Sequence, residues 1–167
     1  MIVLLRCVDL STVPSVIDPF CGTGTIARVL AAGGVKCCTN DINPQHAADT
    51  HADALQPGFY QRMSVAAVVT SPLFAVLDVA LPLAVHSVTT VACIHVPGHF
   101  VTNGHLARMQ YLQRLKQQGR LHIVYGLPRG PLGQRCAWLL VFRTPEVKRQ
   151  LLAPSCQADA DTTFWIE

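Results

Sequence analysis

Residues 16 to 25 read Val16-Ile17-Asp18-Pro19-Phe20-Cys21-Gly22-Thr23-Gly24-Thr25. The apolar run that ends at Asp18 predicts a buried strand, and the glycines predict a tight turn that leads into a helix near Thr25. Open α/β sheets bind ligands at the carboxyl ends of their strands. Gly22 and Gly24 would let the backbone approach a ligand closely, and a helix N-terminus would point free N–H groups at it. A Gly-x-Gly turn alone could be an ordinary turn, and no Gly-Lys-Ser/Thr follows that would indicate a P-loop.

Strand-like and helix-like segments alternate on the C-terminal side of this turn. The patterns predict strands over residues 13–18, 35–40, 65–70, 88–96, 121–125 and 136–142, and helices over 26–32, 75–87 and 103–118. Between residues 44 and 60 the pattern is weak, with a short helix at best and a strand-like fragment near Ala52. The alternation predicts an α/β fold with a doubly wound, Rossmann-like sheet that is mostly parallel. Only a loop joins the last two strands, which predicts an antiparallel hairpin at one edge of the sheet. After Thr144 we expect a short amphipathic piece and a polar end that Trp165 pins to the body.

Length and composition support one domain over residues 1–167, because 167 residues are enough for one core and few for two. Half of the residues are apolar and 14% are charged, as suits a sheet buried on both faces. We expect no membrane span, since no apolar stretch reaches about 18 residues. A secretory signal is not expected either, because Arg6 and Asp9 interrupt the apolar start.

The seven cysteines form no C-x-x-C pair, and their number is odd. Buried thiols of an intracellular protein in a reducing compartment, cytoplasm or nucleus, are the favoured interpretation. A disulfide framework or a zinc site is the alternative, and we expect no metal site. The cysteines are Cys7, Cys21, Cys37, Cys38, Cys93, Cys136 and Cys156.

The net charge is +3, but the basic residues are unevenly placed. No acidic residue lies between Asp78 and Glu146. This basic interval contains Arg108, Arg114, Lys116, Arg120, Arg129, Arg135 and Arg143. The distribution predicts a positive field at one end of the domain and favours nucleic acid as a partner. A solvated face with scattered arginines is the alternative.

The string from Asp18 to Thr25 resembles that of class I S-adenosylmethionine-dependent methyltransferases, in particular the amino-methyltransferases that act on nucleic acids. In that family the matching string wraps the methionine part of the cofactor. The resemblance implies that Asp18 binds the cofactor's ammonium group and that Gly22 and Gly24 lie against its backbone. Phe20 and Thr25 belong to the same predicted cofactor-binding loop.

Two further acidic residues extend the predicted cofactor site. Asp41 follows the second strand about 20 residues after the glycine turn, a position from which a carboxylate accepts both ribose hydroxyls of an adenosine-type ligand. Ile42 is then placed to pack on the adenine face. Capping a helix is the alternative role for Asp41. For Asp53, the resemblance implies a hydrogen bond from the adenine amino group, whereas taken alone Asp53 is a loop carboxylate.

The end of the predicted strand over residues 65–70 continues as Ser71-Pro72-Leu73-Phe74. This run is similar to the S/N/D-P-P-F/Y motif of methyltransferases that modify exocyclic amines of bases. The resemblance implies that the Ser71 oxygen and the Pro72 carbonyl accept the two N–H bonds of the amine, while Phe74 stacks on the base. Leu73 stands where the family has a second proline, which restricts the preceding residue. An ordinary exit from strand to loop is the alternative.

The remaining polar residues are less specific. His95 and His99 flank Pro97-Gly98, which excludes a shared helical face, so we expect packing or surface roles. Arg129 and Arg135 lie in a loop rich in glycine and proline, which predicts either contacts to substrate phosphates or an exposed turn.

The sequence thus predicts methyl transfer from S-adenosylmethionine to an exocyclic amine of a nucleic-acid base, with adenine N6 in DNA or RNA favoured. A catalytically silent methyltransferase-like subunit that binds nucleic acid or a partner enzyme is one alternative. A methyltransferase for a protein amide or a small molecule is the other. The segment before the first strand is short, so a family element that closes the cofactor pocket is expected to be absent or supplied elsewhere. Target recognition is expected from loops or from a partner subunit.

Overall fold

The computed structural model describes residues 2–126, 136–157 and 162–164. Within these ranges the strands form one seven-stranded sheet in the order β2-β1-β3-β4-β6-β5-β7. The strands are β1 Val16–Asp18, β2 Cys37–Thr39, β3 Ala67–Thr70, β4 Val91–Pro97, β5 Leu121–Gly126, β6 Cys136–Phe142 and β7 Thr162–Phe164. The helices are α1 Ile2–Cys7, α2 Thr25–Ala32, α3 Phe59–Met63, α4 Leu77–Ser87, α5 His99–Thr102, α6 Leu106–Gln117, α7 Pro145–Leu151 and α8 Pro154–Gln157, with a 3-10 turn η1 at Phe74–Val76.

The predicted α/β sheet is confirmed. Strands β2, β1, β3 and β4 pair in parallel, and β6 runs antiparallel to both β4 and β5. The predicted hairpin of β5 and β6 does not form the edge, because β7 pairs in parallel with β5 and lies outside it. The tail was expected to be a polar end, but two threonines and a phenylalanine favour a strand where an unpaired edge offers hydrogen bonds. Trp165 lies outside the described residues.

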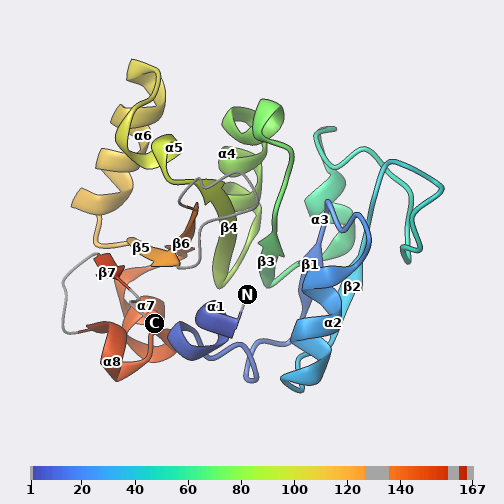
Figure 1. Ribbon diagram of the computed structural model, residues 1–167, viewed down its shortest axis with the longest axis horizontal. Helices are drawn as coiled ribbons and strands as arrows, with labels where there is room; N and C mark the ends of the chain where they lie inside the picture. The colour runs from blue at the N-terminus through green and yellow to red at the C-terminus, as the bar shows by residue number, and fades with distance from the viewer. Residues whose placement is uncertain (1, 127–135, 158–161, 165–167) are drawn as a thin grey trace.

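Helices cover both faces of the sheet, and each face has its own apolar core. Helices α3 to α6 pack on one face, with Phe59, Leu81 and Leu112 in that core. Helices α1, α2, α7 and α8 pack on the other face, with Leu4 and Leu30 in theirs. Figure 1 shows α4, α5 and α6 above the sheet and α1, α7 and α8 below it. Strand β3 lies between the layers with all its residues buried, which explains its unbroken apolar sequence.

The helix that was predicted over residues 75–87 forms as η1 followed by α4, and α4 contains Pro82 without a break. The helix predicted over 103–118 begins three residues later, as α6. Its Leu112 and Leu115 are buried, whereas Leu106 is 74% exposed. The short helix α5 before it had no clear pattern in the sequence.

Helix α1 was not predicted, and it joins the start of the chain to its C-terminal part. Its Leu4 and Cys7 are fully buried in the second core. Backbone hydrogen bonds run from the Asp9 N–H to the Leu151 carbonyl at 2.9 Å and from the Ala153 N–H to the Cys7 carbonyl at 2.8 Å. Of the helices that the structure describes, none combines the length and apolar character that crossing a membrane requires.

Candidate active site

The side chain of Asp18 connects the ends of two neighbouring strands, β1 and β3. Asp18 is fully buried, and its Oδ1 accepts a hydrogen bond from the Thr70 hydroxyl at 2.7 Å and one from the Phe20 N–H at 3.3 Å. Its Oδ2 is also buried and has no hydrogen-bond partner among the described residues. Buried polar atoms are normally paired, so Oδ2 marks a place for a donor that the protein itself does not supply.

The electrostatics of this place favour a cation. Burial, with a smaller contribution from the charge of Asp41, raises the pKa of Asp18 to about 6 despite the lowering effect of the hydrogen bonds from Thr70 and Phe20. Burial, followed by the charges of Asp18 and Asp41, also raises the pKa of the Cys21 thiol to about 11. A positively charged group that hydrogen-bonds to Asp18 would offset the cost of its buried charge.

The glycine loop leaves open space beside Asp18. Gly22 has φ of 52° and Gly24 has φ of 75°, values that side chains other than glycine rarely adopt. A Cβ added at Gly22 would meet nothing within 4 Å. The loop is braced from α2, where the Arg28 guanidinium donates to the Thr23 carbonyl at 2.6 Å and to the Thr25 hydroxyl at 3.2 Å. Thr25 is the first residue of α2, as the sequence predicted to within one residue.

Asp41 follows β2 and closes the other side of this loop. Its Oδ2 accepts a hydrogen bond from the Gly22 N–H at 2.8 Å, and its Oδ1 accepts one from the Asn43 N–H at 2.9 Å. Burial raises the pKa of Asp41, but these two bonds and His46, whose Nδ1 lies 3.2 Å from Oδ2, outweigh burial and hold the pKa below its usual value. No helix begins after Asp41, so the capping alternative does not describe this residue.

Asn40, which the sequence analysis did not single out, joins three segments of the site. Its Nδ2 donates to the carbonyl of Pro19 at 3.0 Å and to that of Ala52 at 2.9 Å. Its Oδ1 accepts from the Thr50 hydroxyl at 2.8 Å and from the Ala52 N–H at 3.0 Å. A fully buried asparagine beside a candidate ligand residue is the signal that could have identified it.

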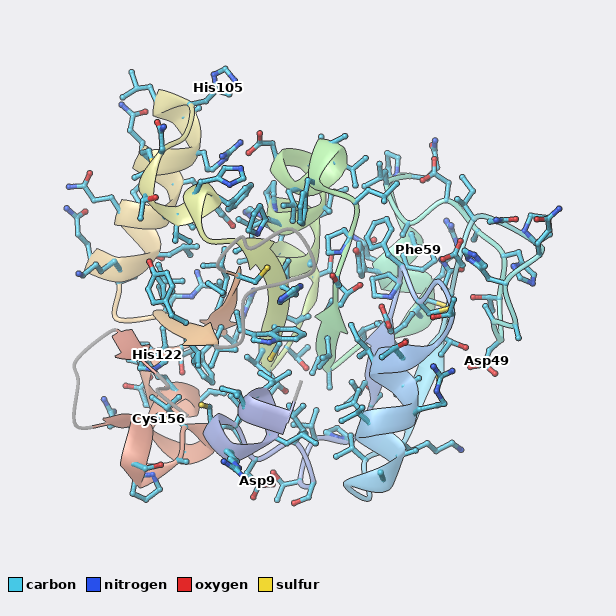
Figure 2. All side chains as sticks on the ribbon, viewed as in Figure 1. Asp9, Asp49, Phe59, His105, His122 and Cys156 are labelled. Atoms are coloured by element: carbon cyan, nitrogen blue, oxygen red, sulfur yellow. The ribbon has the colours of Figure 1, made fainter. Side chains whose placement is uncertain are left out.

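The segment after β2 carries the other two predicted cofactor residues. Ile42 is 65% exposed, as a side chain that covers a ligand face would be. Asp53 is half-buried, and its carboxylate accepts from the Leu55 N–H at 2.9 Å and from the Gln56 side chain at 3.1 Å. The segment is tied back to β2 by Asp49, which accepts from the Thr39 N–H at 2.7 Å; Figure 2 labels Asp49 beside this strand.

The residues of the predicted acceptor motif directly follow β3. Pro72 is buried, whereas Ser71 is exposed and Phe74 is 54% exposed. Leu73 is 77% exposed, has φ of −57° and ψ of 139°, and its carbonyl accepts from the Val76 N–H at 3.0 Å. This φ is the value that proline itself imposes. The backbone at Leu73 therefore already has a shape that the family's second proline would fit.

His95 lies beside this motif, where the sequence analysis expected only a packing or surface role. Its Nδ1 is 3.2 Å from the Ser71 oxygen, and its ring centroid is 5.0 Å from that of Trp138. Burial lowers the pKa of His95 below its ordinary value. Sequence reasoning could have noticed it as a polar residue near the carboxyl end of an otherwise apolar strand.

Part of the basic interval serves the fold. The Arg108 guanidinium makes two hydrogen bonds of 2.6 Å to Asp78 and lies 3.9 Å from the centroid of the Phe100 ring. The Arg120 Nε donates to the Phe142 carbonyl at 2.8 Å. Arg129 and Arg135 lie outside the described residues. Among the residues that the structure describes, no group of three or more His, Cys, Asp or Glu side chains is arranged to hold a metal ion.

Comparison with known proteins identifies the fold. No known protein family and no curated protein matches the sequence. A type I restriction-modification methyltransferase subunit from Streptococcus thermophilus has a TM-score of 0.59 and 12% identity, over 80% of this chain and 40% of its own. A SAM-dependent methyltransferase from Archaeoglobus fulgidus has a TM-score of 0.57 and 12% identity, over 80% of this chain and 87% of its own.

A third match carries a ligand of the expected class. Magnesium protoporphyrin IX methyltransferase from Synechocystis, solved with bound SAH, has a TM-score of 0.56 and 13% identity, over 81% of this chain and 76% of its own. The chain therefore has the Rossmann-like fold of class I methyltransferases. It spans 40% of the length of the restriction-modification subunit.

Proposed function

We propose that the chain is an S-adenosylmethionine-dependent methyltransferase domain that acts on an exocyclic amine of a nucleic-acid base, with adenine N6 in DNA or RNA as the favoured target. The observation that carries this proposal is the 2.7 Å hydrogen bond from Thr70 to Asp18. It joins Thr70, the last residue of β3 before Ser71-Pro72-Leu73-Phe74, to Asp18, the last residue of β1 before the glycine loop. A cofactor held by the loop would thus lie next to an acceptor held by the motif.

The residues around Asp18 fit S-adenosylmethionine. The unpartnered Oδ2 of Asp18 can accept from the ammonium group, and the open space at Gly22 leaves room for the chain that carries it. Each oxygen of the Asp41 carboxylate accepts one backbone N–H, and Oδ2 also lies 3.2 Å from His46 Nδ1. A carboxylate oxygen can accept more than one hydrogen bond, so Oδ1 in particular can still accept from a ribose hydroxyl. Ile42 is exposed where it can cover the adenine, and Asp53 follows on the segment that Asn40 ties to the same strand end.

The residues after β3 fit an amine acceptor. The bound cofactor supplies a methyl group that its sulfonium already activates, so the protein's part is chiefly to orient the attacking nitrogen. An exocyclic amine is planar, with its lone pair delocalised into the ring. In this proposal the Ser71 oxygen and the Pro72 carbonyl accept its N–H bonds, and the base stacks on the exposed Phe74 ring.

The silent-subunit alternative draws its support from Leu73 and from the short segment before the first strand, and the backbone at Leu73 weakens the first of these two supports. The φ of −57° at Leu73 is compatible with proline, and the side chain points into solvent. The backbone at this position would thus accept the family's second proline without a change of φ. Nucleic acid and a partner subunit for target recognition remain part of the proposal, since the restriction-modification neighbour is itself a subunit of a larger system.

Calorimetry with S-adenosylhomocysteine, followed by tritiated-methyl transfer to DNA, RNA and protein, tests the proposal. We expect binding by the wild type and its loss in Asp18→Asn, because an amide cannot pair with the ammonium charge. Asp9→Asn is the matched control, since Asp9 is exposed and its carboxylate bonds only to Ser11 in the described structure. A wild type that binds no S-adenosylhomocysteine would contradict the cofactor, and transfer to protein alone would contradict the substrate class.

A further inference from the structure

We propose that His95 is a positioning residue of the acceptor site. Its Nδ1 accepts a hydrogen bond from the Ser71 hydroxyl, which leaves the lone pairs of the Ser71 oxygen free for the acceptor amine. The inference rests on the proposed function of Ser71. It assigns a role to a side chain that neither the cofactor loop nor the acceptor motif contains.

The strand order brings His95 to Ser71. Strands β3 and β4 are parallel neighbours in which Thr70 pairs with Ile94, so the residues that follow them, Ser71 and His95, lie side by side. The Ser71 oxygen and the His95 Nδ1 lie 3.2 Å apart, within hydrogen-bond distance. His95 lies two residues before the end of β4 and is therefore held by the sheet. Ser71 comes just after β3, and its hydroxyl is held by the hydrogen bond to His95.

The imidazole of His95 also contacts the indole of Trp138. His95 pairs with Trp138 across the antiparallel strands β4 and β6, and their ring planes are inclined by 46° at a centroid separation of 5.0 Å. Trp138 itself is 5% exposed and belongs to the second core. An imidazole held between a buried indole and a strand neighbour keeps one orientation, which a positioning role requires.

The chemistry of the acceptor explains why Ser71 needs such a partner. A hydroxyl both donates and accepts, and its proton rotates to suit its surroundings. An amine that presents N–H bonds needs an acceptor, and a serine proton turned toward it would set two donors against each other. An imidazole with its proton on Nε2 can accept a hydrogen bond at Nδ1 from the serine hydroxyl, whose proton stays on the oxygen. Burial lowers the pKa of His95 and so favours the neutral ring that this arrangement needs.

Nitrogen-15 spectroscopy of the histidine side chains tests the bond without cofactor or substrate. In the cofactor-free wild type at neutral pH we expect His95 as the Nε2–H tautomer, with Nδ1 shifted from the value of a free acceptor nitrogen. Ser71→Ala should return the Nδ1 signal toward the free value, and His95→Gln assigns the signal by removing it. A proton on Nδ1, or an Nδ1 signal that Ser71→Ala leaves in place, would overturn the inference.

Two variants of the same residue separate positioning from packing. The amide oxygen of asparagine can occupy the place of Nδ1, whereas the longer glutamine side chain reaches toward that of Nε2. We expect His95→Asn to keep kcat within about threefold of the wild type and His95→Gln to lose about tenfold, the effect that one neutral hydrogen bond sustains. The KM for the cofactor should not change in either. Equal losses in both variants would indicate packing and overturn the inference.

The matched controls and the two possible failures can be told apart. His86→Asn and His86→Gln change an exposed histidine of α4 whose Nδ1 lies 2.6 Å from the Pro82 carbonyl, and should leave kcat unchanged. A wild type that methylates nothing but shows the Nε2–H tautomer and its dependence on Ser71 would overturn the proposed function and retain the bond. An active enzyme with the proton on Nδ1 would overturn the role of His95 and retain the function.

Discussion

The carboxylate of Asp41 accepts a hydrogen bond of 2.8 Å from the backbone N–H of Gly22, although 19 residues separate them in the sequence. This bond joins the end of β2 to the glycine loop after β1. The two predicted cofactor contacts, to the ribose and to the methionine part, are therefore parts of one connected structure. A change at Asp41 should affect both.

The first prediction concerns this connection. Asp41→Ala should weaken binding of S-adenosylhomocysteine by about 1–3 kcal/mol, because ribose hydroxyls and the Gly22 N–H lose their acceptor. Asp41→Asn keeps one oxygen and should lose less. Calorimetry gives both affinities, and circular dichroism checks that each variant is folded. Equal affinity in wild type and a folded Asp41→Ala would remove Asp41 from the site.

The second prediction concerns the stability cost of Asp18. Its pKa is about 6 in the folded protein and near 3.8 in the unfolded chain, so the folded state binds the proton more tightly. The stability that this proton contributes is complete below pH 3.8 and is lost as the pH rises through 6. At pH 7 the buried charge then costs on the order of 3 kcal/mol, since each pKa unit corresponds to about 1.4 kcal/mol.

Asp18→Asn should remove this cost. We expect the cofactor-free variant to be more stable than the wild type at pH 7, with a difference that shrinks toward pH 4. Urea unfolding at several pH values measures this difference in stability. Asp9→Asn is the control: the pKa of Asp9 is lowered, so its replacement should change the stability with the opposite sign. A constant difference across this range would show that Asp18 does not titrate there.

The third prediction distinguishes a role in orienting the acceptor amine from a role in binding the cofactor. Ser71→Ala should reduce methyl transfer strongly and leave the affinity for S-adenosylhomocysteine within about twofold, since the lost hydrogen bond orients the amine. Phe74→Ala should act in the same direction through a stacking contact worth about 1–3 kcal/mol. Val79→Ala, another half-exposed apolar side chain on α4, is the control. Parallel losses of affinity and turnover would place Ser71 in cofactor binding instead.

Leu73→Pro tests the departure from the family motif. Because φ at Leu73 is already −57°, proline should cost the folded state nothing and should restrict the unfolded chain, which predicts equal or higher melting temperature and equal or higher activity. Thermal unfolding and the methyl-transfer assay measure the two quantities. A destabilised and inactive Leu73→Pro would mean that the loop needs the Leu73 N–H, and would favour a silent subunit.

The last prediction concerns the polyanionic partner. Binding to nucleic acid should weaken steeply with salt, because phosphate contacts release counterions. Replacing Arg129 and Arg135 with alanine should lower the affinity and flatten this dependence. Arg149→Ala, which changes an exposed arginine of α7, should leave the slope unchanged. Absence of binding by the wild type at low salt would contradict both the partner and the base substrate.

The sequence predicted those features that depend on a single strand or turn. Asp18, Asp41 and Ser71 each follow an apolar run, and the carboxyl ends of parallel strands meet at one edge of the sheet, so their approximate proximity followed from the pattern. The bond of Asp41 to Gly22 and the position of His95 did not follow. They depend on how segments distant in sequence pair, which no local pattern encodes.

Helix α1 and strand β7, which were not predicted, also depend on contacts with distant segments. Helix α1 is six residues long, too short to be stable by itself, and exists because its apolar side packs on the sheet. Strand β7 exists because β5 offers it an edge. Leu106 recurs at the helical interval of the buried Leu112 and Leu115, but it lies in the first turn of α6 and is exposed.

The clasp between residues 7–9 and 151–153 has a consequence for biosynthesis. A ribosome makes α1 long before it makes residues 151–153, whose backbone groups hold the end of this helix. During translation the side chains of Leu4 and Cys7 therefore lack their final packing partners and are exposed to solvent or to chaperones. Contacts between such distant segments also slow the closing step of folding, since the intervening chain loses its freedom before the contact forms. Helix α1 is thus synthesised well before the contacts that fix it in place can form.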